Sequence, residues 1–457
     1  MKKFYFALVL LSWSVTQAQI LFDSYQSTNV GQYNFGKAIA AFNNTVISAS
    51  GSPFLPTRGK LEIFNANSSD LMPTQTFQPA DGTDGDNYGF AVDINENYIA
   101  VGAPLYDSQF SNSGAVYVYK KTNGNWSLLQ KIIPQDGIAL GNFGYTVKLH
   151  EDQLFIGSPN FASSSNTLGK IYIYNLDQTT ATFTQELYFQ GRNGVANAFS
   201  LNSGKLVLSY SQSGTKYIET FIKTGNSWIS EGRFSVDVAG YYFRNLRLDN
   251  DYLYAQFSDV SDTGAFIRVY KNTNNNWEYE SEIMLSEPNY SITDFEVTAD
   301  KMIIGYGYSR IGGKSPAVFY KKINEAWLLQ EFFFGDADPS DSDSFGSNIV
   351  FDNGKIYIGA PAEGATSTGK IYYTDNVLSI ADFDANSGIF PNPTSGKLTI
   401  NDPEVKNAEV YNIMGQKVLS QQIQFNEISL ESLQNGLYVV KLNDNYGKST
   451  SYKIIKN

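Results

Sequence analysis

Four segments of the chain repeat one hairpin pattern, in which a strand ends in an aromatic residue and a Trp follows after a polar turn. The aromatic residue and the Trp lie seven positions apart in each copy: Tyr119/Trp126, Phe221/Trp228, Tyr270/Trp277 and Tyr320/Trp327. A constant offset of this kind indicates a structural unit that recurs along the chain. The fold is therefore expected to be a repeat architecture with a period of about 50 residues.

This hairpin belongs to a longer unit. The clearest copy contains Tyr88-Gly89, an apolar strand at 98–103, an alternating strand at 114–119 and the strand around Trp126. Four short strands separated by turn residues fit this pattern, and the chain as a whole is rich in strand-forming aromatic residues. The copies begin with an aromatic residue at Phe35, Tyr88, Phe143, Phe199, Phe243, Phe295 and Phe345. Steps of 44 to 56 residues match four-stranded blades and predict an all-β, seven-bladed β-propeller.

The two ends of the repeat array complement each other. The seventh copy stops at Thr374 without its fourth strand, whereas Ile20–Tyr25 precedes the first copy without partners of its own. We expect Ile20–Tyr25 to supply the missing outer strand of the last blade, because this pairing removes an exposed edge and closes the ring.

Two short motifs recur within the unit. Tyr88-Gly89 is followed by 102–104 (Gly-Ala-Pro), and Phe345-Gly346 by 359–361 (Gly-Ala-Pro). This pair of motifs resembles the FG-GAP repeats of integrin α-subunit propellers. The resemblance implies a propeller of about this size that usually serves as an extracellular binding or adhesion platform, and it does not imply an enzyme.

Integrin-type repeats often carry a calcium loop between the two motifs. The corresponding segments here, 93–97 and 352–355, are too short to supply six or more oxygen ligands. We expect tight turns there, in which Asn, Asp and Gly provide side-chain bonds or positive φ. Carboxylates also gather at 81–86 and at Asp336, Asp338, Asp341 and Asp343. The latter four are weak candidates for a calcium site, but solvated loops are the favoured interpretation. No other cofactor is expected.

The composition offers little catalytic chemistry. His150 is the only His and there is no Cys, so a zinc site or a Cys-His pair within one chain is excluded. Glu151 and Asp152 follow His150 on an expected turn, where neighbouring side chains point apart more often than together. No catalytic residue is identified. A net charge of −12 disfavours nucleic acid and anionic lipid as partners.

Most aromatic residues occupy strand positions or the repeated Trp position, where packing between blades is a sufficient explanation. Five aromatic residues lie outside those positions and are the better candidates for stacking on a sugar ligand: Tyr25, Tyr33, Tyr106, Phe110 and Phe161.

Residues 1–18 have the pattern of a secretory signal peptide, with Lys2 and Lys3 before a short apolar run and cleavage expected between Ala18 and Gln19. The apolar run is shorter than the roughly 20 residues that cross a bilayer, and no later segment comes closer. The mature chain is therefore expected to have no transmembrane segment.

The repeat pattern ends near Thr374, and a polar linker at 378–388 leads to a segment of alternating strands at 389–457, which predicts a small β-sandwich. This segment resembles the type A C-terminal sorting domain of the type IX secretion system of Bacteroidetes. The matching residues are Pro391, Asn392, Pro393, Gly396, Gly415, Gly436, Tyr438 and Lys453. The resemblance implies Sec export to the periplasm, recognition by the outer-membrane machinery, and then release or attachment at the cell surface.

The expected organisation is a signal peptide at 1–18, a propeller at 19–377, a linker at 378–388 and a sorting domain at 389–457. The expected function is a secreted or cell-surface binding or adhesion module, with a glycan or a surface protein as its ligand. The alternative is an extracellular polysaccharide-degrading enzyme with its site at the central channel of the propeller. Convergent carboxylates there would favour the enzyme, whereas an aromatic or acidic rim would favour binding.

Overall fold

The computed structural model describes residues 23–27, 34–50, 58–68, 72–159, 162–163, 166–167, 169–177, 179–188, 198–236, 238, 240–259, 264–284, 291–307, 316–323, 325–333, 335, 344–361, 369–374, 389–390, 394–400, 405–412, 417–423, 426–434, 436–444 and 449–456. The regular elements among these residues are all β-strands. The chain separates into two compact units, one formed by Phe22–Asp375 and the other containing Asn376–Asn457.

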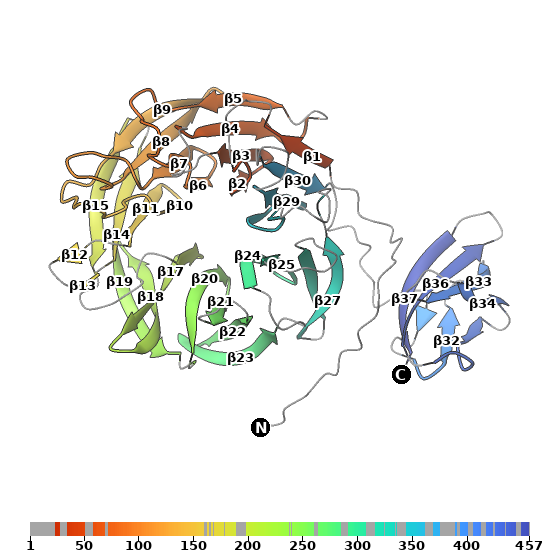
Figure 1. Ribbon diagram of the computed structural model, residues 1–457. Helices are drawn as coiled ribbons and strands as arrows, with labels where there is room; N and C mark the ends of the chain where they lie inside the picture. Colours follow the sequence, from red (N-terminus) through yellow and green to blue (C-terminus); the bar gives the residue numbers. More distant parts are fainter. Residues whose placement is uncertain are drawn as a thin grey trace. The chain divides into compact units, whose positions relative to one another are not determined.

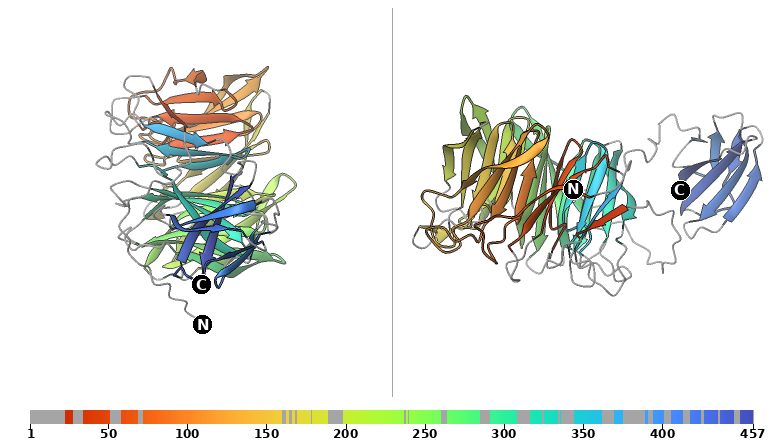
Figure 2. Two further views of the ribbon diagram at one scale, coloured as in Figure 1. Left: turned by 90° about the vertical axis from the view of Figure 1, so that its right-hand side faces the viewer. Right: turned by 90° about the horizontal axis from the view of Figure 1, so that it is seen from above.

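The first unit consists of seven four-stranded antiparallel sheets arranged as blades around a common axis (Figures 1 and 2). Blade 1 contains β2 (Ala38–Phe42), β3 (Thr45–Ser50), β4 (Lys60–Asn65) and β5 (Pro73–Phe77). Blade 2 contains β6 (Ala91–Ile94), β7 (Tyr98–Ala103), β8 (Ala115–Thr122) and β9 (Asn125–Ile132). Blade 3 contains β10 (Thr146–His150), β11 (Gln153–Ser158), β14 (Lys170–Leu176) and β15 (Ala181–Tyr188), with a small hairpin of β12 (Ala162–Ser163) and β13 (Asn166–Thr167).

Blade 4 contains β16 (Phe199–Asn202), β17 (Lys205–Gln212), β18 (Thr215–Thr224) and β19 (Ser227–Ser235). Blade 5 contains β20 (Tyr241–Asp249), β21 (Tyr252–Asp259), β22 (Ala265–Thr273) and β23 (Asn276–Met284). Blade 6 contains β24 (Ser291–Thr298), β25 (Lys301–Gly307), β26 (Ala317–Ile323) and β27 (Ala326–Phe333). Blade 7 contains β28 (Ile349–Asp352), β29 (Lys355–Ala360) and β30 (Lys370–Thr374), and takes its fourth strand from β1 (Asp23–Gln26).

The ring is closed by β1, as the sequence predicted. This strand pairs antiparallel with β30, with Asp23 opposite Tyr373 and Tyr25 opposite Ile371. The earlier part of the predicted closing segment, 20–22, lies outside the described residues. Because the N-terminal strand completes the C-terminal blade, the first and last repeats are joined by backbone hydrogen bonds, and the array has no free edge at that point.

The two glycine motifs hold successive blades together. The Gly89 N–H donates to the Gly102 carbonyl of the same blade at 2.9 Å, so the Tyr-Gly turn is attached to the second strand. In the other direction, a Cβ added to Gly102 would lie 2.0 Å from the carbonyl oxygen of Gly144 in the next blade. A Cβ on Gly359 would lie 1.9 Å from the oxygen of Gly36, which repeats the contact at the ring closure. Only glycine allows backbones to approach this closely.

In three blades the residue taken as the start of the repeat was placed wrongly. Phe35, Tyr88, Phe143 and Phe345 precede the innermost strand of their blades, but Phe199, Phe243 and Phe295 lie inside β16, β20 and β24. Blades 4 to 6 therefore lack the Phe-Gly turn. The number of blades was nevertheless correct, because a step of about 50 residues tolerates a shift of a few positions, and a buried aromatic residue inside the strand also fills the core.

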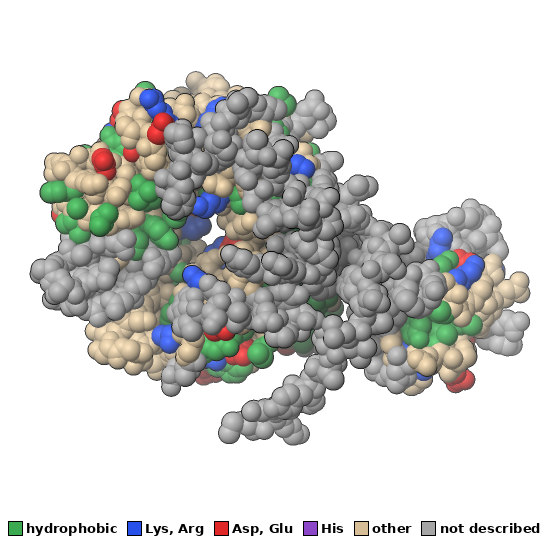
Figure 3. Space-filling view, viewed as in Figure 1, with side chains coloured by type: hydrophobic (Ala, Val, Ile, Leu, Met, Phe, Trp, Pro, Cys, Tyr) green, Lys and Arg blue, Asp and Glu red, His purple; other side chains and the backbone are tan. Residues whose placement is uncertain are grey.

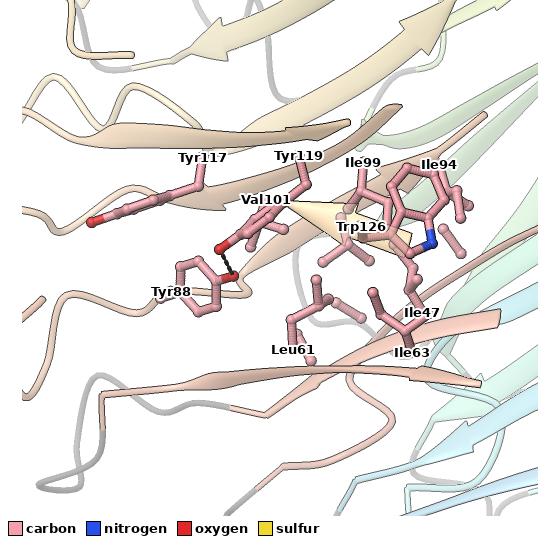
Figure 4. Packing of buried hydrophobic residues seen from close by; sticks show 14 of the residues in the cluster. Ile47, Leu61, Ile63, Tyr88, Ile94, Ile99, Val101, Tyr117, Tyr119 and Trp126 are labelled. Carbon is pink, nitrogen blue, oxygen red and sulfur yellow. Dashed lines mark hydrogen bonds between the residues drawn. The ribbon is translucent and has the colours of Figure 1, made fainter. Parts of the chain in front are cut away.

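The repeated Trp residues pack between blades, as predicted. Trp126 of blade 2 contacts a cluster that includes Ile47, Leu61 and Ile63 of blade 1 (Figure 4). Trp228 of blade 4 is buried, and its indole N–H donates to Gln153 Oε1 of blade 3 at 3.0 Å. Truncation of such a residue typically costs about 3–5 kcal/mol, so these contacts account for much of the cohesion between blades.

The C-terminal unit contains two antiparallel sheets. One is formed by β31 (Ile389–Phe390), β32 (Lys397–Ile400) and β35 (Glu427–Ser429), and the other by β34 (Lys417–Gln422), β33 (Val405–Asn412), β36 (Gly436–Asp444) and β37 (Ser449–Lys456). One apolar cluster draws residues from both sheets, including Leu398, Ile400, Val410, Val440 and Ile454. Two sheets around a shared core agree with the expected small β-sandwich.

Candidate functional site

The blades carry different connections at their two ends. At one end the first and second strands are joined by tight turns, as in Asn43–Asn44 and Asn353–Gly354, where all four residues have positive φ between 47° and 80°. In the longer turn after Asp93, Asn95 Oδ1 accepts the backbone N–H of Tyr98 at 2.8 Å. These are the tight turns that the sequence predicted. At the other end, connections such as 78–90, 104–114 and 133–145 are long.

Three residues at equivalent positions of blades 1 to 3 form a row at the long-loop end of the innermost strands. Lys37, Phe90 and Tyr145 each follow the glycine of the Phe-Gly or Tyr-Gly motif. Each closes a turn with its own backbone N–H, which donates to the carbonyl three residues earlier at 3.1 Å. Because the innermost strands of neighbouring blades lie side by side, the turns bring these three side chains together.

The contacts within this row are aromatic. The Phe90 and Tyr145 ring centroids are 4.7 Å apart with an interplanar angle of 47°. Lys37 Nζ lies 5.4 Å from the Phe90 centroid, within range of a cation–π interaction. Phe90 and Tyr145 are half-buried and Lys37 is exposed. We call Lys37, Phe90 and Tyr145 the aromatic row.

Lys37 differs electrostatically from other basic residues of the ring. Although the side chain as a whole is exposed, burial lowers the pKa of its ammonium group. Within the described ranges, no carboxylate forms an ion pair with Lys37. The aromatic row therefore presents a positive charge whose counter-ion is not supplied by the described part of the chain.

A charged network occupies the innermost strands of blades 5 to 7. Arg247 Nη2 donates to Asp294 Oδ1 at 2.9 Å, and Arg247 Nε donates to Glu296 Oε2 at 3.0 Å. The other oxygen of Asp294 accepts the Ile349 N–H at 3.0 Å and the Asn348 side-chain amide at 3.2 Å. Burial raises the pKa of Asp294, whereas Arg247 opposes this rise. Arg247, Asp294 and Asn348 thereby connect three successive blades.

A further carboxylate belongs to the innermost strand of blade 2. Asp93 Oδ2 accepts the Leu149 N–H of blade 3 at 2.7 Å, so it too bridges two blades. Burial raises the pKa of Asp93, Lys148 lowers it, and the charge of Glu296 contributes a smaller rise. Acidic and basic side chains are both visible near the centre of the ring in Figure 3. The innermost strands thus do gather carboxylates. The hydrogen bonds described above use these carboxylates to connect neighbouring blades.

In the acidic segment at 81–86, the carboxylates of Asp81 and Asp86 pair with other groups of the protein. Asp81 forms an ion pair with Lys131 and accepts a hydrogen bond from the Tyr117 hydroxyl at 3.2 Å. The hydrogen bond from Lys131 is the main reason why the pKa of Asp81 is lowered. Asp86 accepts the Thr83 N–H at 2.6 Å. Within the described residues, no group of three or more His, Asp or Glu side chains could hold a metal ion. The candidates Asp336, Asp338, Asp341 and Asp343 lie outside the described residues.

The five aromatic residues predicted to stack on a sugar differ in how accessible the structure makes them. Tyr25 is buried, with its ring centroid 5.3 Å from that of Phe35 and 4.6 Å from that of Phe64, so its interpretation as an accessible ligand contact was wrong. It belongs to the closing strand, whose inward face joins the core. Tyr106 is half-buried and its hydroxyl accepts a hydrogen bond from Lys131 at 2.8 Å. Phe110 is 47% exposed. Tyr33 and Phe161 lie outside the described residues.

His150 and Glu151 both contact blade 4, through different partners. Glu151 Oε2 accepts a hydrogen bond from Lys223 Nζ of blade 4 at 2.8 Å. The His150 ring lies 6.4 Å from that of Trp228, and burial lowers the pKa of His150. His150 therefore packs against the interface between blades 3 and 4.

Part of the sorting-signal set is described in the C-terminal unit. Gly396 has φ +140° and its carbonyl accepts the Leu430 N–H at 2.6 Å. Gly436 is the first residue of β36, and the Tyr438 ring packs over it, 3.9 Å from the position of an added Cβ. The Tyr438 hydroxyl donates to the Gln434 carbonyl at 2.7 Å. Lys453 lies in β37 opposite Val439. Pro391, Asn392, Pro393 and Gly415, like the cleavage residues Ala18 and Gln19, lie outside the described residues.

Sequence reasoning missed Phe90, Tyr145, Arg247, Asp294 and Glu296. The first two could have been found by comparing the residue after each motif glycine across the copies, which gives Lys37, Phe90 and Tyr145 for blades 1 to 3. The charged network could not be found by such a comparison, because equivalent positions in blades 5 and 6 were not matched correctly.

Two family models match this chain. Residues 388–457 match the secretion system C-terminal sorting domain, and residues 73–119 match the FG-GAP repeat. Both resemblances drawn from the sequence are confirmed. The sorting-domain match indicates secretion through the type IX system to the cell surface or the extracellular space. Among the residues described, no helix is long and apolar enough to span a bilayer.

Curated relatives are distant. Beta-agarase D of Zobellia galactanivorans is 22% identical over 246 residues, which cover 51% of this chain and 50% of that protein. Human integrin alpha-6 is 29% identical over 169 residues, which cover 35% of this chain and 14% of the integrin. The matches therefore span half or less of the length of these relatives. Among solved structures, a protein from Lactobacillus plantarum has a TM-score of 0.47 at 14% identity, covering 65% of this chain and 84% of that one. The Dos1 propeller has a TM-score of 0.46 at 10% identity, covering 78% and 95%.

Proposed function

We propose that this protein is a glycan-binding module, exported by the type IX system, whose ligand stacks on the aromatic row. The observation that carries the proposal is the pair Phe90 and Tyr145, two half-buried rings 4.7 Å apart at equivalent positions of adjacent blades. An aromatic face with a polar group beside it is the combination that recognises an amphipathic ring such as a sugar. Partial likeness to an agarase and to an integrin supports a role in binding outside the cell.

Binding is tested by titrating a soluble glycan panel into the full chain. The Phe90→Ala and Tyr145→Ala variants are each expected to weaken binding at least tenfold, because each removes one of the two rings proposed to contact the sugar. Phe110→Ala is the matched control, since Phe110 is an exposed aromatic residue on another long loop. Equal binding by all three variants would contradict the assignment of the site, provided that their thermal unfolding is unchanged.

A second candidate function is polysaccharide cleavage. The observation that favours it is the half-buried carboxylate Asp93 on the innermost strand of blade 2. Desolvation raises the pKa of Asp93, and the negative charge of Glu296 in blade 6 contributes a smaller rise. Two carboxylates in unequal environments are what a glycosidic acid and base require. The test is release of reducing ends from agar and related polysaccharides by the wild type and by Asp93→Asn, which keeps an oxygen for the Leu149 N–H. Cleavage by the wild type that disappears in Asp93→Asn would support the enzyme hypothesis. If the wild type releases no reducing ends, the enzyme hypothesis is wrong.

Export is assigned to the C-terminal unit, with Gly396, Gly436, Tyr438 and Lys453 among the proposed recognition residues. The proposed route begins with cleavage between Ala18 and Gln19. Deleting 389–457 is expected to retain the propeller inside the cell envelope, as measured by cell fractionation. Undiminished appearance of the truncated propeller in the medium would contradict the proposed role of this unit.

A further inference from the structure

We infer that the ligand of the aromatic row is an acidic sugar residue, bearing a carboxylate or a sulfate that pairs with Lys37. This inference rests on the proposed function and names the ligand class of the same site. It starts from the position of Lys37 Nζ, 5.4 Å from the Phe90 centroid. A sugar ring stacked on Phe90 would bring a substituent on its edge within reach of this ammonium group.

The charge of Lys37 is available, in contrast to the other cations of the innermost strands. Arg247 is bonded to Asp294 and Glu296, and the charge of Lys148 acts on Asp93. Lys37 has no such partner among the residues described. A cation with reduced hydration and no counter-ion gains more from a ligand anion than a fully hydrated one does, because part of its desolvation has already occurred.

Because the chain as a whole is acidic, recognition of an acidic sugar must depend on a few specific contacts. A net charge of −12 opposes the approach of a generic polyanion. An acidic sugar must therefore be held by a specific pair at the row rather than by a diffuse positive surface. The cation–π contact with Phe90 already favours one position of the Lys37 ammonium group, which reduces the freedom that Lys37 would lose on binding.

The probes are two pairs of glycans, and the members of each pair differ in whether they carry a free acidic group. Oligogalacturonate is compared with its methyl ester, and carrageenan oligosaccharide with its desulfated form, by calorimetric titration of the full chain. We expect at least one acidic member to bind about tenfold more tightly than its neutral counterpart. The pair that shows the difference distinguishes a carboxylate from a sulfate.

Lys121 provides a matched control. Its Nζ lies 5.3 Å from the Trp126 ring centroid, so it is also a lysine over an aromatic ring, but it belongs to β8, close to the short turn that leads to β9. Lys37→Met is expected to abolish the preference for the acidic member, and Lys121→Met to preserve it. Lys37→Met should also leave the melting temperature unchanged or raised, since it removes a charge that burial disfavours.

The outcomes separate the inference from the function on which it rests. If acidic and neutral members bind equally and Phe90→Ala weakens both, the row binds glycans but the acidic class is wrong. If Lys37→Met and Lys121→Met lower the preference to the same extent, the pairing with Lys37 is wrong. If no member of either pair binds, both the acidic class and the glycan-binding assignment are overturned.

Discussion

Replacing Gly305 with Ala should destabilise the propeller far more than replacing Gly307, although both are buried glycines of β25 on the same face of the strand. Both have backbone conformations open to alanine. A Cβ on Gly305 would lie 1.9 Å from the Gly346 carbonyl oxygen, a backbone atom of the next blade. A Cβ on Gly307 would meet only the side-chain atoms Ser291 Oγ and Thr293 Cγ2, each at 2.7 Å.

The magnitude follows from how far each neighbour must move. Ordinary contact begins near 3.4 Å, so the Gly346 carbonyl would have to retreat by about 1.5 Å, and overpacking of this kind costs about 1–3 kcal/mol. The retreat also breaks the hydrogen bond from Thr293 Oγ1 to the Gly346 carbonyl, 2.8 Å long, worth about 1 kcal/mol. We expect Gly305→Ala to lower the free energy of unfolding by about 2–4 kcal/mol. Gly307→Ala should cost only about 1 kcal/mol, because the Ser291 and Thr293 side chains can rotate away and lose at most the hydrogen bond of Thr293.

Urea unfolding followed by Trp fluorescence measures this difference. Residues 376–457 contain no Trp, and Trp126, Trp228, Trp277 and Trp327 all belong to the propeller. In the chain without residues 1–18, which removes Trp13, the signal therefore reports the propeller alone. Both variants should keep the denaturant dependence of the wild type and differ in the midpoint. Equal losses, or a loss below about 0.5 kcal/mol for Gly305→Ala, would refute the argument that the glycine contact sets the spacing between blades.

Two further predictions concern charged groups. Arg247→Met leaves Asp294 and Glu296 without their cation and should cost about 3–5 kcal/mol in urea unfolding; a variant as stable as the wild type would contradict the role of this network. The hydrogen bond from Lys131 lowers the pKa of Asp81 in the folded state, so its contribution is present above the unfolded-state pKa near 4 and is lost as pH falls through the folded-state value. The stability difference between wild type and Asp81→Asn should therefore shrink below about pH 4, and a difference independent of pH would count against it.

Much of the fold could be predicted because its signals are local. Alternation along each strand and the fixed offset before Trp126 and its counterparts report pairing between neighbours in sequence, and the two incomplete ends of the array implied the closing strand β1. The register of blades 4 to 6 could not be predicted in this way. Phe199 and Phe295 satisfy the same requirement for a buried aromatic residue as Phe35, although they do so from inside the strand.

The candidate site was harder to predict because it exists only in the closed ring. Phe90 and Tyr145 are 55 positions apart and read individually as ordinary residues after a glycine. Only the side-by-side arrangement of innermost strands puts their rings in contact. Asp294 is similar, since its partners Arg247 and Asn348 come from the preceding and following blades.

The distribution of the Phe-Gly turn also limits the aromatic row to one side of the ring. The fifth residue of the second strand is a glycine in blades 2, 3, 6 and 7, but it is Ala49 in blade 1, Ser209 in blade 4 and Gln256 in blade 5. Gly102, Gly305 and Gly359 lie against a Phe-Gly or Tyr-Gly turn of the next blade, whereas Gln256 contacts blade 6, which lacks the turn. There the Gln256 amide donates to the Ile292 carbonyl at 2.7 Å and replaces the close backbone approach. A blade without the turn has no residue at the position of Phe90 and so cannot extend the row. Glycan binding by this propeller should therefore be asymmetric, built by blades 1 to 3, while blades 4 to 6 retain the ring through side-chain bonds.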